Sequence, residues 1–485
     1  MDKPFLPPES ESGLEAVTEG NQVAFFYDNK LLYATMAADL ARATGTADFV
    51  YTANWWCDVD VPLGNPAASP PFLRALLATA ANGNASSDAP EGAQVCGMLW
   101  RQKSQFDWRG LPNAFLSLPV SIFGDPLLSA VNTKAMKHIR SLPADSHAFL
   151  DGDHRLAGSH HQKILLVKTG ERLVAYVGGV DFNADRIFAK GGKAVNPPTG
   201  PGTPLEDLMC RIEGEGADAV LNTFKTRWNL HPEGRSKPLR GQNFTSKPIS
   251  RGTAQVQISH TYGKGYPFKK EVTTASKTYL NLISQAKRYI YVEDQYLIGT
   301  PELANAIRDR LNTQLGLHVI AVMSPMAISD LPFRQTACDI FWTPFTAGYL
   351  DRVKIFEMLN VHGKPDGVGS YLHSKLMIVD DEVVTVGSVN FSNRSMYHDT
   401  EILAAVGGDA EDDDQPKSHA ARVRLTRWSR HLGVARQSIL RIEDGIARWK
   451  ALPTTALVKA WAANPATKWP SPIHKSTFER FIDPR

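Results

Sequence analysis

The sequence predicts an α/β fold made of two similar α/β/α halves, whose mixed, mostly parallel sheets are related by pseudo-two-fold symmetry. Two observations support this prediction. Helical patterns alternate along the chain with short β-rich runs, which is typical of α/β units. In addition, one order of elements occurs twice, and 485 residues are too many for a single ordinary core. We therefore expect a duplicated unit.

The first copy of this order begins with a helical pattern over Asn29 to Thr44. A buried-strand pattern at Asp48 to Thr52 follows and leads into the polar-aromatic loop Asn54-Trp55-Trp56. The second copy has the matching helix, strand and loop at Glu271 to Arg288, Tyr289 to Val292 and Glu293 to Tyr296. Each half then adds another strand, near Gln94 to Leu99 and near His318 to Met323, before a His-x-Lys segment.

The duplication divides the chain into five parts. We expect an N-terminal extension (1–20), a first half (21–230), a linker (231–253), a second half (254–410) and a helical C-terminal extension packed on the core (411–485). The linker is predicted from its Gly, Pro and basic residues. The stretches 82–94 and 190–204 and the acidic run 411–414 are expected to be surface loops.

The composition is typical of a soluble globular protein, with 43% hydrophobic and 21% charged residues. The net charge of +3 gives no bulk attraction for nucleic acid, so we expect no such partner. Four scattered cysteines without a C-x-x-C pair argue against a disulfide framework or a zinc site. No Sec-type signal peptide and no apolar run of about eighteen residues is present. We expect a monomer made in the cytoplasm, with peripheral membrane contact and no transmembrane segment, and export by a non-Sec route stays open.

Two His-x-Lys segments carry the chemistry. In a β-strand, residues i and i+2 point to the same face, so His161 and Lys163 project together, as do His373 and Lys375. Small residues follow each segment, at 178–179 and 387–388, and would allow a second strand to approach closely. Each half therefore presents one imidazole and one ammonium group at the end of a hairpin.

Two histidines and two lysines suit an anionic phosphodiester. The lysines would neutralise charge on the non-bridging oxygens. One imidazole can attack phosphorus to form a phosphohistidine, while the other protonates the leaving alcohol and later activates water. A carboxylate behind each histidine would fix its tautomer, and Asp207 and Glu401 occupy equivalent places in the two halves.

The segment YLHSKLMIVDDEVVTVGSVNFSNRS resembles the second HKD motif of the phospholipase D superfamily. HHQK followed by GGVDF resembles the first motif of its animal and plant branch, as do Trp55-Trp56, LEDLMCRIEG, FKTRW, EDQY and RLTRWSRHLG around it. The resemblance runs from about residue 21 to 433. It implies a phospholipase D-like fold, His161 as nucleophile, His373 as general acid and base, and no metal or other cofactor. Lys163, Lys375 and Asn390 would hold the phosphate.

The first motif departs from the family pattern at two positions. Lys168 stands where the family has an Asp that usually stabilises a turn, so we expect activity to survive. Asp181 stands where the second half has Asn390, and we expect it to bond to a neighbouring loop. The residues offered for a headgroup pocket are Trp55, Trp56, Glu293, Gln295 and Tyr296.

An aromatic group within Asp339 to Leu350 has two interpretations. Phe341, Phe345 and Tyr349 are spaced as on a core helix, which we favour over a membrane-dipping surface that would also include Trp342.

These features predict a phospholipase D that hydrolyses the distal phosphodiester of glycerophospholipids at a membrane surface. The products would be phosphatidic acid and a free headgroup, and an alcohol could replace water as the acceptor of the phosphatidyl group. The alternatives on the same frame are a cardiolipin-directed phospholipase or phosphatidyltransferase, a nuclease, and a phospholipid-binding protein without activity. A nuclease would show strongly salt-dependent binding to its substrate.

Overall fold

The computed structural model describes residues 4–7, 16–64, 69–83, 92–101, 126–155, 157–186, 205–247, 249, 252–265, 267–328, 331–359, 370–410 and 416–485. The predicted loop 190–204 and the acidic run 411–414 lie outside these residues, as does most of the predicted loop 82–94. Within the described part, no helix combines the length and the apolar character needed to cross a bilayer.

The strands of the two halves repeat one order. In the first half they are β1 (Thr18–Phe26), β2 (Phe49–Asn54), β3 (Gln94–Trp100), β4 (His147–Asp151), β5 (Ile164–Thr169), β6 (Arg172–Gly178) and β7 (Met209–Glu213). In the second half they are β8 (Ala254–Tyr262), β9 (Val272–Thr273), β10 (Tyr289–Asp294), β11 (His318–Met323), β12 (Val353–Met358), β13 (Leu376–Val379), β14 (Val383–Gly387), β15 (Glu401–Gly407) and β16 (Val458–Trp461).

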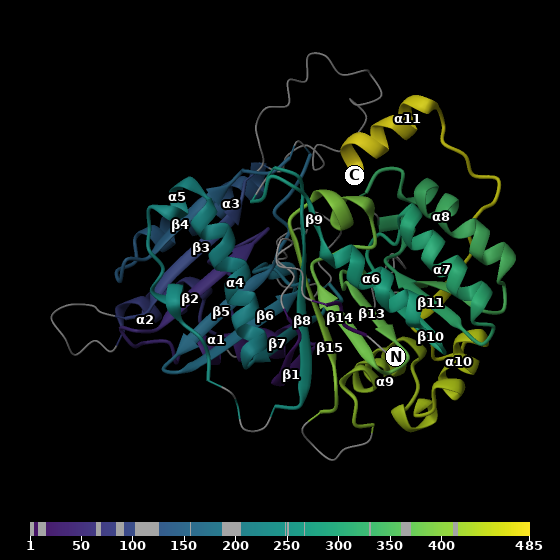
Figure 1. Ribbon diagram of the computed structural model, residues 1–485, viewed down its shortest axis with the longest axis horizontal. Helices are drawn as coiled ribbons and strands as arrows, with labels where there is room; N and C mark the ends of the chain where they lie inside the picture. Colours follow the sequence, from purple (N-terminus) through teal and green to yellow (C-terminus); the bar gives the residue numbers. More distant parts are fainter. Residues whose placement is uncertain are drawn as a thin grey trace.

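All these strands belong to one mixed 16-stranded sheet of the described residues. Outward from its centre the first half reads β1-β7-β6-β5-β2-β3-β4, and the second reads β8-β15-β14-β13-β10-β11-β12, with β16 added at the edge. The halves join where β1 pairs antiparallel with β8, through Thr18 opposite Val256 and Asn21 opposite Ala254. Figure 1 shows β1 and β8 side by side between the two halves. The predicted duplicated α/β fold is confirmed.

Parallel pairing is narrower than we expected. It is confined to β2-β3-β4 and β10-β11-β12, and the other ladders are antiparallel. The reason is local, because the strands after the His-x-Lys segments continue directly into hairpins. Asp380 and Asp381 turn β13 into β14 with φ of 58° and 63°, and Gly170 turns β5 into β6 with φ of 59°. Short turns of this kind can only connect antiparallel neighbours.

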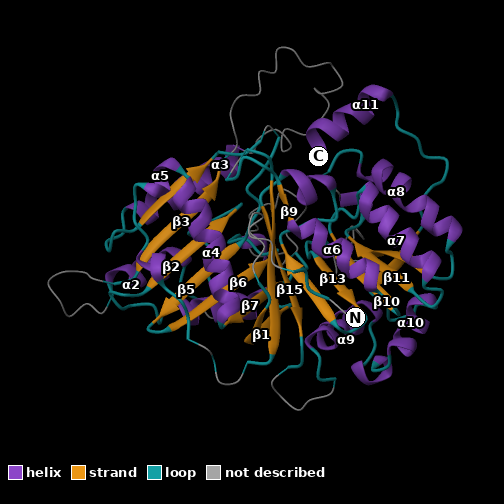
Figure 2. Ribbon diagram, viewed as in Figure 1, coloured by secondary structure: helices purple, strands orange, loops and turns teal. Residues whose placement is uncertain are grey.

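Helices cover both faces of each half, as Figure 2 shows for the sheet as a whole. The helices are α1 (Asn29–Leu40), α2 (Leu73–Asn82), α3 (Pro126–Arg140), α4 (Glu215–Leu230), α5 (Pro232–Arg235), α6 (Thr274–Gln285), α7 (Pro301–Thr313), α8 (Arg334–Gly348), α9 (His419–Leu432), α10 (Ile442–Lys450) and α11 (Pro472–Thr477). One apolar cluster joins α1, α2 and α3 to the first half, and another joins α6, α7 and α8 to the second.

A third apolar cluster lies on the opposite face and crosses from one half to the other. It includes Phe224 and Trp228 of α4 together with Trp428 of α9 and Trp449 of α10. The two halves therefore share one core in addition to the core that each has on its outer face.

The helix boundaries follow from capping residues. Asp28 accepts a hydrogen bond from the backbone N–H of Lys30 (2.8 Å) at the start of α1. Ser418 caps α9 in the same way, and Gly433, with φ of 64°, ends that helix in the left-handed conformation. In α8, Trp342 and Phe345 are fully buried, and Phe341 and Tyr349 are partly buried against the same apolar cluster. The aromatic group therefore packs on the core, although Trp342 and not Phe341 or Tyr349 is buried together with Phe345.

The segment predicted as a linker packs on the first half. It contains α5 and a turn of 3-10 helix (Arg240–Asn243). The Arg240 guanidinium donates to the carbonyls of Thr46 and Gly92, at 2.6 and 2.7 Å. β1 begins at Thr18, inside the predicted N-terminal extension.

Candidate active site

The His-x-Lys segments lie just before β5 and β13, where the two halves meet. Lys163 Nζ donates to the carbonyl of His161 at 2.9 Å, and Lys375 Nζ donates to the carbonyl of His373. Each lysine therefore folds back beside its own histidine. Both lysine side chains are buried.

Each histidine is paired with a carboxylate from the other half of the chain. His161 Nδ1 lies 3.1 Å from both oxygens of Glu401, and His373 Nδ1 lies 2.8 Å from Asp207 Oδ2. The backbone repeats this exchange, because His161 N–H donates to the carbonyl of Thr400 (2.9 Å). His373 N–H likewise donates to the carbonyl of Glu206, the residue before Asp207 (2.7 Å). Since Nδ1 is engaged in both rings, Nε2 is the nitrogen available to a substrate.

Glu401 is fully buried and accepts further hydrogen bonds from two serines. Ser395 Oγ donates to Oε1 at 2.7 Å, and Ser388 Oγ donates to Oε2. Burial, followed by the charge of Asp399, raises the pKa of the Glu401 carboxyl to about 8, and the two serine hydroxyls oppose this rise. The two serines thus favour the ionised carboxylate but do not cancel the effect of burial.

Asp207 has a different surrounding in the equivalent place. Its Oδ1 accepts from the backbone N–H of Leu208 at 2.8 Å, and Arg186 Nε lies 3.8 Å from Oδ2. Burial raises the pKa of Asp207, while the charges of Lys375 and Arg186 lower it. A Cβ atom added to Gly179 would collide with this carboxylate. Gly179 therefore makes room where the second half has Ser388.

The small residues that follow each hairpin allow the close approach that the sequence predicts. A Cβ atom on Gly178 would overlap the carbonyl of Leu208, and one on Gly387 would overlap the carbonyl of Ile402. These are the strands that carry Asp207 and Glu401 to the histidines.

The lysines are held by different partners in the two halves. Lys163 Nζ lies 3.2 Å from Asp181 and 5.8 Å from the ring centre of Trp55. Lys375 Nζ donates to Oε1 of Gln295, which holds the place of Trp55 in the second half. Burial lowers the pKa of Lys375 to about 8 and also lowers that of Lys163.

Both imidazoles have a pKa well below the ordinary value. Burial is the main cause, and the charges of Lys163 and Lys375 act in the same direction. His161 also lowers the pKa of His373, so the four groups act on one another electrostatically. A neutral imidazole is a nucleophile, and the charge of an arriving phosphodiester would raise the pKa of its neighbour toward the range of a proton donor.

The residues expected to contact a headgroup separate into two groups. Trp55 lies edge-on to His161, with ring centres 6.2 Å apart, and Gln295 contacts Lys375, so both are at the histidines. Trp56 is 3% exposed, and its backbone N–H donates to Asp181 at 3.0 Å. Tyr296 packs on the outer core of the second half.

Glu293, expected at a headgroup pocket, is bonded to residues of the protein interior. It is fully buried and accepts two hydrogen bonds of 2.8 Å from Arg427. His431 Nε2 lies 3.0 Å away, and Ser374 Oγ donates to Glu293 at 2.7 Å. Both oxygens of this carboxylate therefore accept hydrogen bonds from the protein interior behind His373.

The positions where the first motif departs from the family pattern have structural explanations. Lys168 Nζ donates to the carbonyl of Ala47 (2.7 Å) and lies 3.4 Å from Asp48, just before β2. In the second half, Asp380 accepts from three backbone N–H groups just before β10. Lys168 and Asp380 therefore connect their hairpins to the neighbouring strand at equivalent positions, one as a cation and the other as an anion. Asn390 is buried, and within the described residues its Oδ1 has no hydrogen-bond partner.

Sequence reasoning missed the arginines behind the histidines. Arg227 of α4 donates to Gln162 (2.8 Å) and to Asp151 (2.7 Å), while Arg427 of α9 holds Glu293. Both are almost fully buried. A signal for them exists, because the pattern Thr-Arg-Trp-x-x-His occurs at 226–231 and again at 426–431.

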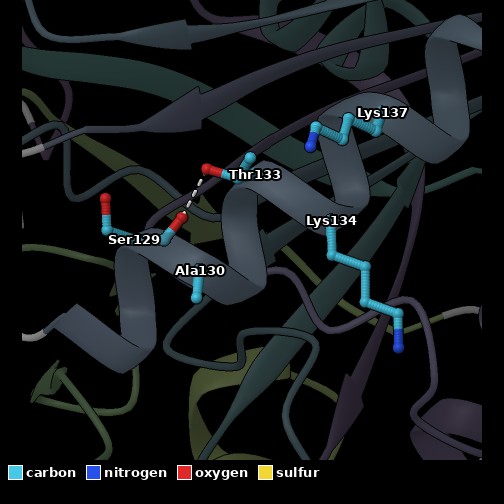
Figure 3. Close-up of a pocket in the computed structure, with 5 residues that line it drawn as sticks. All are labelled: Ser129, Ala130, Thr133, Lys134 and Lys137. Atoms are coloured by element: carbon cyan, nitrogen blue, oxygen red, sulfur yellow. Dashed lines mark hydrogen bonds between the residues drawn. The ribbon is translucent and has the colours of Figure 1, made fainter.

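A depression on the surface of α3 lies apart from these residues. It is lined by Ser129, Ala130, Thr133, Lys134 and Lys137. Figure 3 shows the two lysines extending in different directions from the helix. The buried side of α3 does support the site, because Asn132 Nδ2 donates to the carbonyls of Trp55 and Trp100, both at 2.9 Å.

Comparison with known proteins finds a matching family model and several relatives. The family model described as "Cardiolipin synthase, PLD-like domain" matches residues 279–412. Cardiolipin synthase 1 of Staphylococcus epidermidis is 25% identical over 292 residues, which cover 59% of this chain and 52% of that protein. Phospholipase D A of Dictyostelium discoideum is 26% identical over 382 residues, which cover 63% of this chain and 28% of that protein. The chain spans about half, or less, of the length of these relatives.

A solved structure has the same fold. The phosphatidylserine synthase of Haemophilus influenzae Rd KW20 aligns with a TM-score of 0.55 and 13% identity, covering 95% of this chain and 93% of that one. This likeness shows that the two chains share a fold. The chain belongs to the phospholipase D superfamily.

Proposed function

We propose that the protein transfers phosphatidyl groups of glycerophospholipids between alcohols through a phosphohistidine at His161. The crossed histidine–carboxylate pairs support this proposal most directly. Among the described residues, the side-chain hydrogen bonds of both rings are made through Nδ1, so that Nε2 of each histidine can approach a phosphorus centre, and each histidine has a buried lysine beside it. The match to the cardiolipin synthase model and relatives supports an alcohol as the acceptor.

In the first step, Nε2 of His161 attacks phosphorus and a P–N bond forms. The bond between phosphorus and the leaving alcohol oxygen breaks, and His373 gives a proton to that oxygen. Lys163 and Lys375 neutralise the non-bridging oxygens, and Asn390 donates a hydrogen bond to the phosphate. In the second step, the acceptor oxygen gives its proton to His373 and attacks phosphorus, and the P–N bond breaks.

Hydrolysis to phosphatidic acid is the second candidate function. It differs only in the acceptor, because water would take the place of the alcohol in the second step. The HKD-type motifs and the match to a phospholipase D over 63% of the chain favour it.

Vesicles of phosphatidylglycerol test both candidates in one experiment. Mass spectrometry should detect cardiolipin and glycerol if transfer dominates, and phosphatidic acid if hydrolysis dominates. His161→Ala should abolish both products, and His373→Ala should accumulate phosphorylated His161. His474→Ala, on α11, is the control and should keep wild-type turnover. Wild-type turnover in His373→Ala, or the absence of every product from the wild type, would contradict the proposal.

A further inference from the structure

The C-terminal segment Phe478–Asp483 packs on the outer face of the second half. Phe478 and Ile482 are buried in the apolar cluster of α6, α7 and α8. The chain that leads to it is fixed on α8, where Asp339 accepts from Thr467 Oγ1 at 2.7 Å and from Asn464 N–H at 2.9 Å. In Figure 1 this chain passes α8 and α11 and ends close to α11. The segment is therefore an integral part of this half.

Asp483 fixes the loop that follows β14. Its side chain is 3% exposed, and it accepts hydrogen bonds from Arg394 N–H (2.7 Å), Asn393 N–H (3.1 Å) and Asn393 Nδ2 (2.9 Å). These three donors lie at the start of the π-helical turn Arg394–His398. One buried carboxylate thus determines where this turn begins.

Arg394 connects the same segment to the chain that precedes His161. Its guanidinium donates to the carbonyl of Ile482 (3.1 Å) and to the carbonyl of Ala157 (3.1 Å). It also donates to Asp399 at 2.8 Å, and Asp399 accepts from Ser159 N–H at 2.9 Å. A single cation therefore joins the C-terminal segment, the turn and the first half.

The turn Arg394–His398 contains a residue that contacts the His161–Glu401 pair. Ser395 belongs to the turn and donates to Glu401, which is bonded to His161. The second pair has other supports, since the contacts of Asp207 come from Leu208 and Arg186 in the first half. The two pairs thus differ in what holds them.

We propose that the segment Phe478–Asp483 acts as a clamp that positions the His161–Glu401 pair, with Asp483 and Arg394 as positioning residues. The expected effect on kinetics rests on the proposed function, in which His161 is the nucleophile. Loosening the clamp misplaces the imidazole of His161, while Lys163 keeps Asp181 and Lys375 keeps Gln295 as partners outside the clamp. It should therefore lower kcat by about 10- to 100-fold, with KM nearly unchanged.

The test compares Asp483→Asn with Glu479→Gln in the full-length chain. Glu479 belongs to the same segment, but its carboxylate faces solvent and lies 3.7 Å from Lys475. Asn393→Ala removes only one of the three hydrogen bonds and keeps the test usable if Asp483→Asn does not fold. Each variant is treated with diethylpyrocarbonate, and labelling of His161 and His373 is followed by peptide mass spectrometry. The two side chains are exposed to similar degrees, 15% and 11%, so each serves as a reference for the other.

Asp483→Asn, or Asn393→Ala in its place, should change the labelling rate of His161 several-fold and leave that of His373 as in the wild type. Glu479→Gln should change neither. Equal changes at both histidines, or none at either, would overturn the clamp. Labelling needs no turnover, so a wild type that makes no lipid product would refute the proposed function while the clamp is still decided. Where turnover is found, a rise in KM with kcat unchanged in Asp483→Asn would also overturn the clamp.

Discussion

Ser388 and Ser395 stabilise the ionised form of the carboxylate behind His161. Both hydroxyls donate to Glu401, and both oppose the rise in its pKa caused by burial. Ser388→Ala or Ser395→Ala should therefore raise the pKa of Glu401 further. Because the ionised carboxylate is the acceptor for His161 Nδ1, activity should increase with pH through this pKa, and each variant should move the acid limb of kcat/KM to higher pH. This limb belongs to the coupled pair rather than to one residue. An unchanged or lowered limb in both variants would refute the assignment.

We expect the affinity for an anionic substrate to fall in the alkaline pH range, because Lys375 loses its charge there. Its pKa is lowered to about 8 by burial, so the amine is charged below this pH and neutral above it. A phosphodiester keeps its negative charge throughout this range. The KM for a soluble phosphodiester should therefore rise as pH increases above about 8. In Lys375→Arg the charge persists, and KM should stay flat. A KM of the wild type that is constant up to pH 10 would count against a phosphate-holding role.

A buried arginine of α4 donates to Gln162, next to His161, and a buried arginine of α9 donates to Glu293, which accepts from Ser374, next to His373. Truncating Arg427 leaves the Glu293 carboxylate buried without its charge partner, and such a loss costs about 3–5 kcal/mol. Urea denaturation of Arg427→Ala should show a fall of this size in the free energy of unfolding. The control is Lys247→Ala, because Lys247 is 70% exposed and pairs with Glu171 on the surface. That variant should change stability by about 1 kcal/mol or less. Similar values for both variants would contradict the role of the buried network.

A charged side chain connects each of the hairpins β5–β6 and β13–β14 to the neighbouring strand. It is the lysine Lys168 in the first half and the aspartate Asp380 in the second. Asp380→Ala removes the acceptor of three backbone N–H groups and should destabilise the fold by about 2–4 kcal/mol. Lys168→Ala loses one carbonyl contact and one ion pair and should cost less, about 1 kcal/mol. Since Lys168 stands at the far end of β5 from Lys163, its loss should leave kcat unchanged. A strong loss of turnover in Lys168→Ala at full stability would show that the position matters for chemistry.

The two halves of the chain cannot form the site independently of each other. Each histidine takes its carboxylate from the other half, and Arg430 of α9 donates to Glu206 at 2.6 Å across the same boundary. The apolar cluster around Trp228 and Trp428 is continuous between the halves. Calorimetry should therefore show one cooperative unfolding transition, with equal calorimetric and van't Hoff enthalpies. Two resolved transitions would indicate halves that fold separately.

Local patterns in the amino-acid sequence predict the elements and the candidate reacting groups. The helix at 29–44 and the strands at 48–52 and 318–323 were legible because apolar periodicity is local, and the structure places α1, β2 and β11 there. The two His-x-Lys segments were legible because a repeat needs no knowledge of the fold. Asp207 and Glu401 could also be selected, but not assigned to one histidine or the other.

Which of these groups meet follows from the way the chain packs. The exchange of carboxylates between the halves, the withdrawal of Glu293 into an internal network and the contact of Asp483 with Arg394 all join residues far apart in the chain. Such contacts depend on how strands pair and how helices pack, and neither is encoded in a local pattern. The hairpins β5–β6 and β13–β14 are set by local turns, but the antiparallel pairing of β1 with β8 joins residues more than 200 positions apart and depends on how the two halves pack.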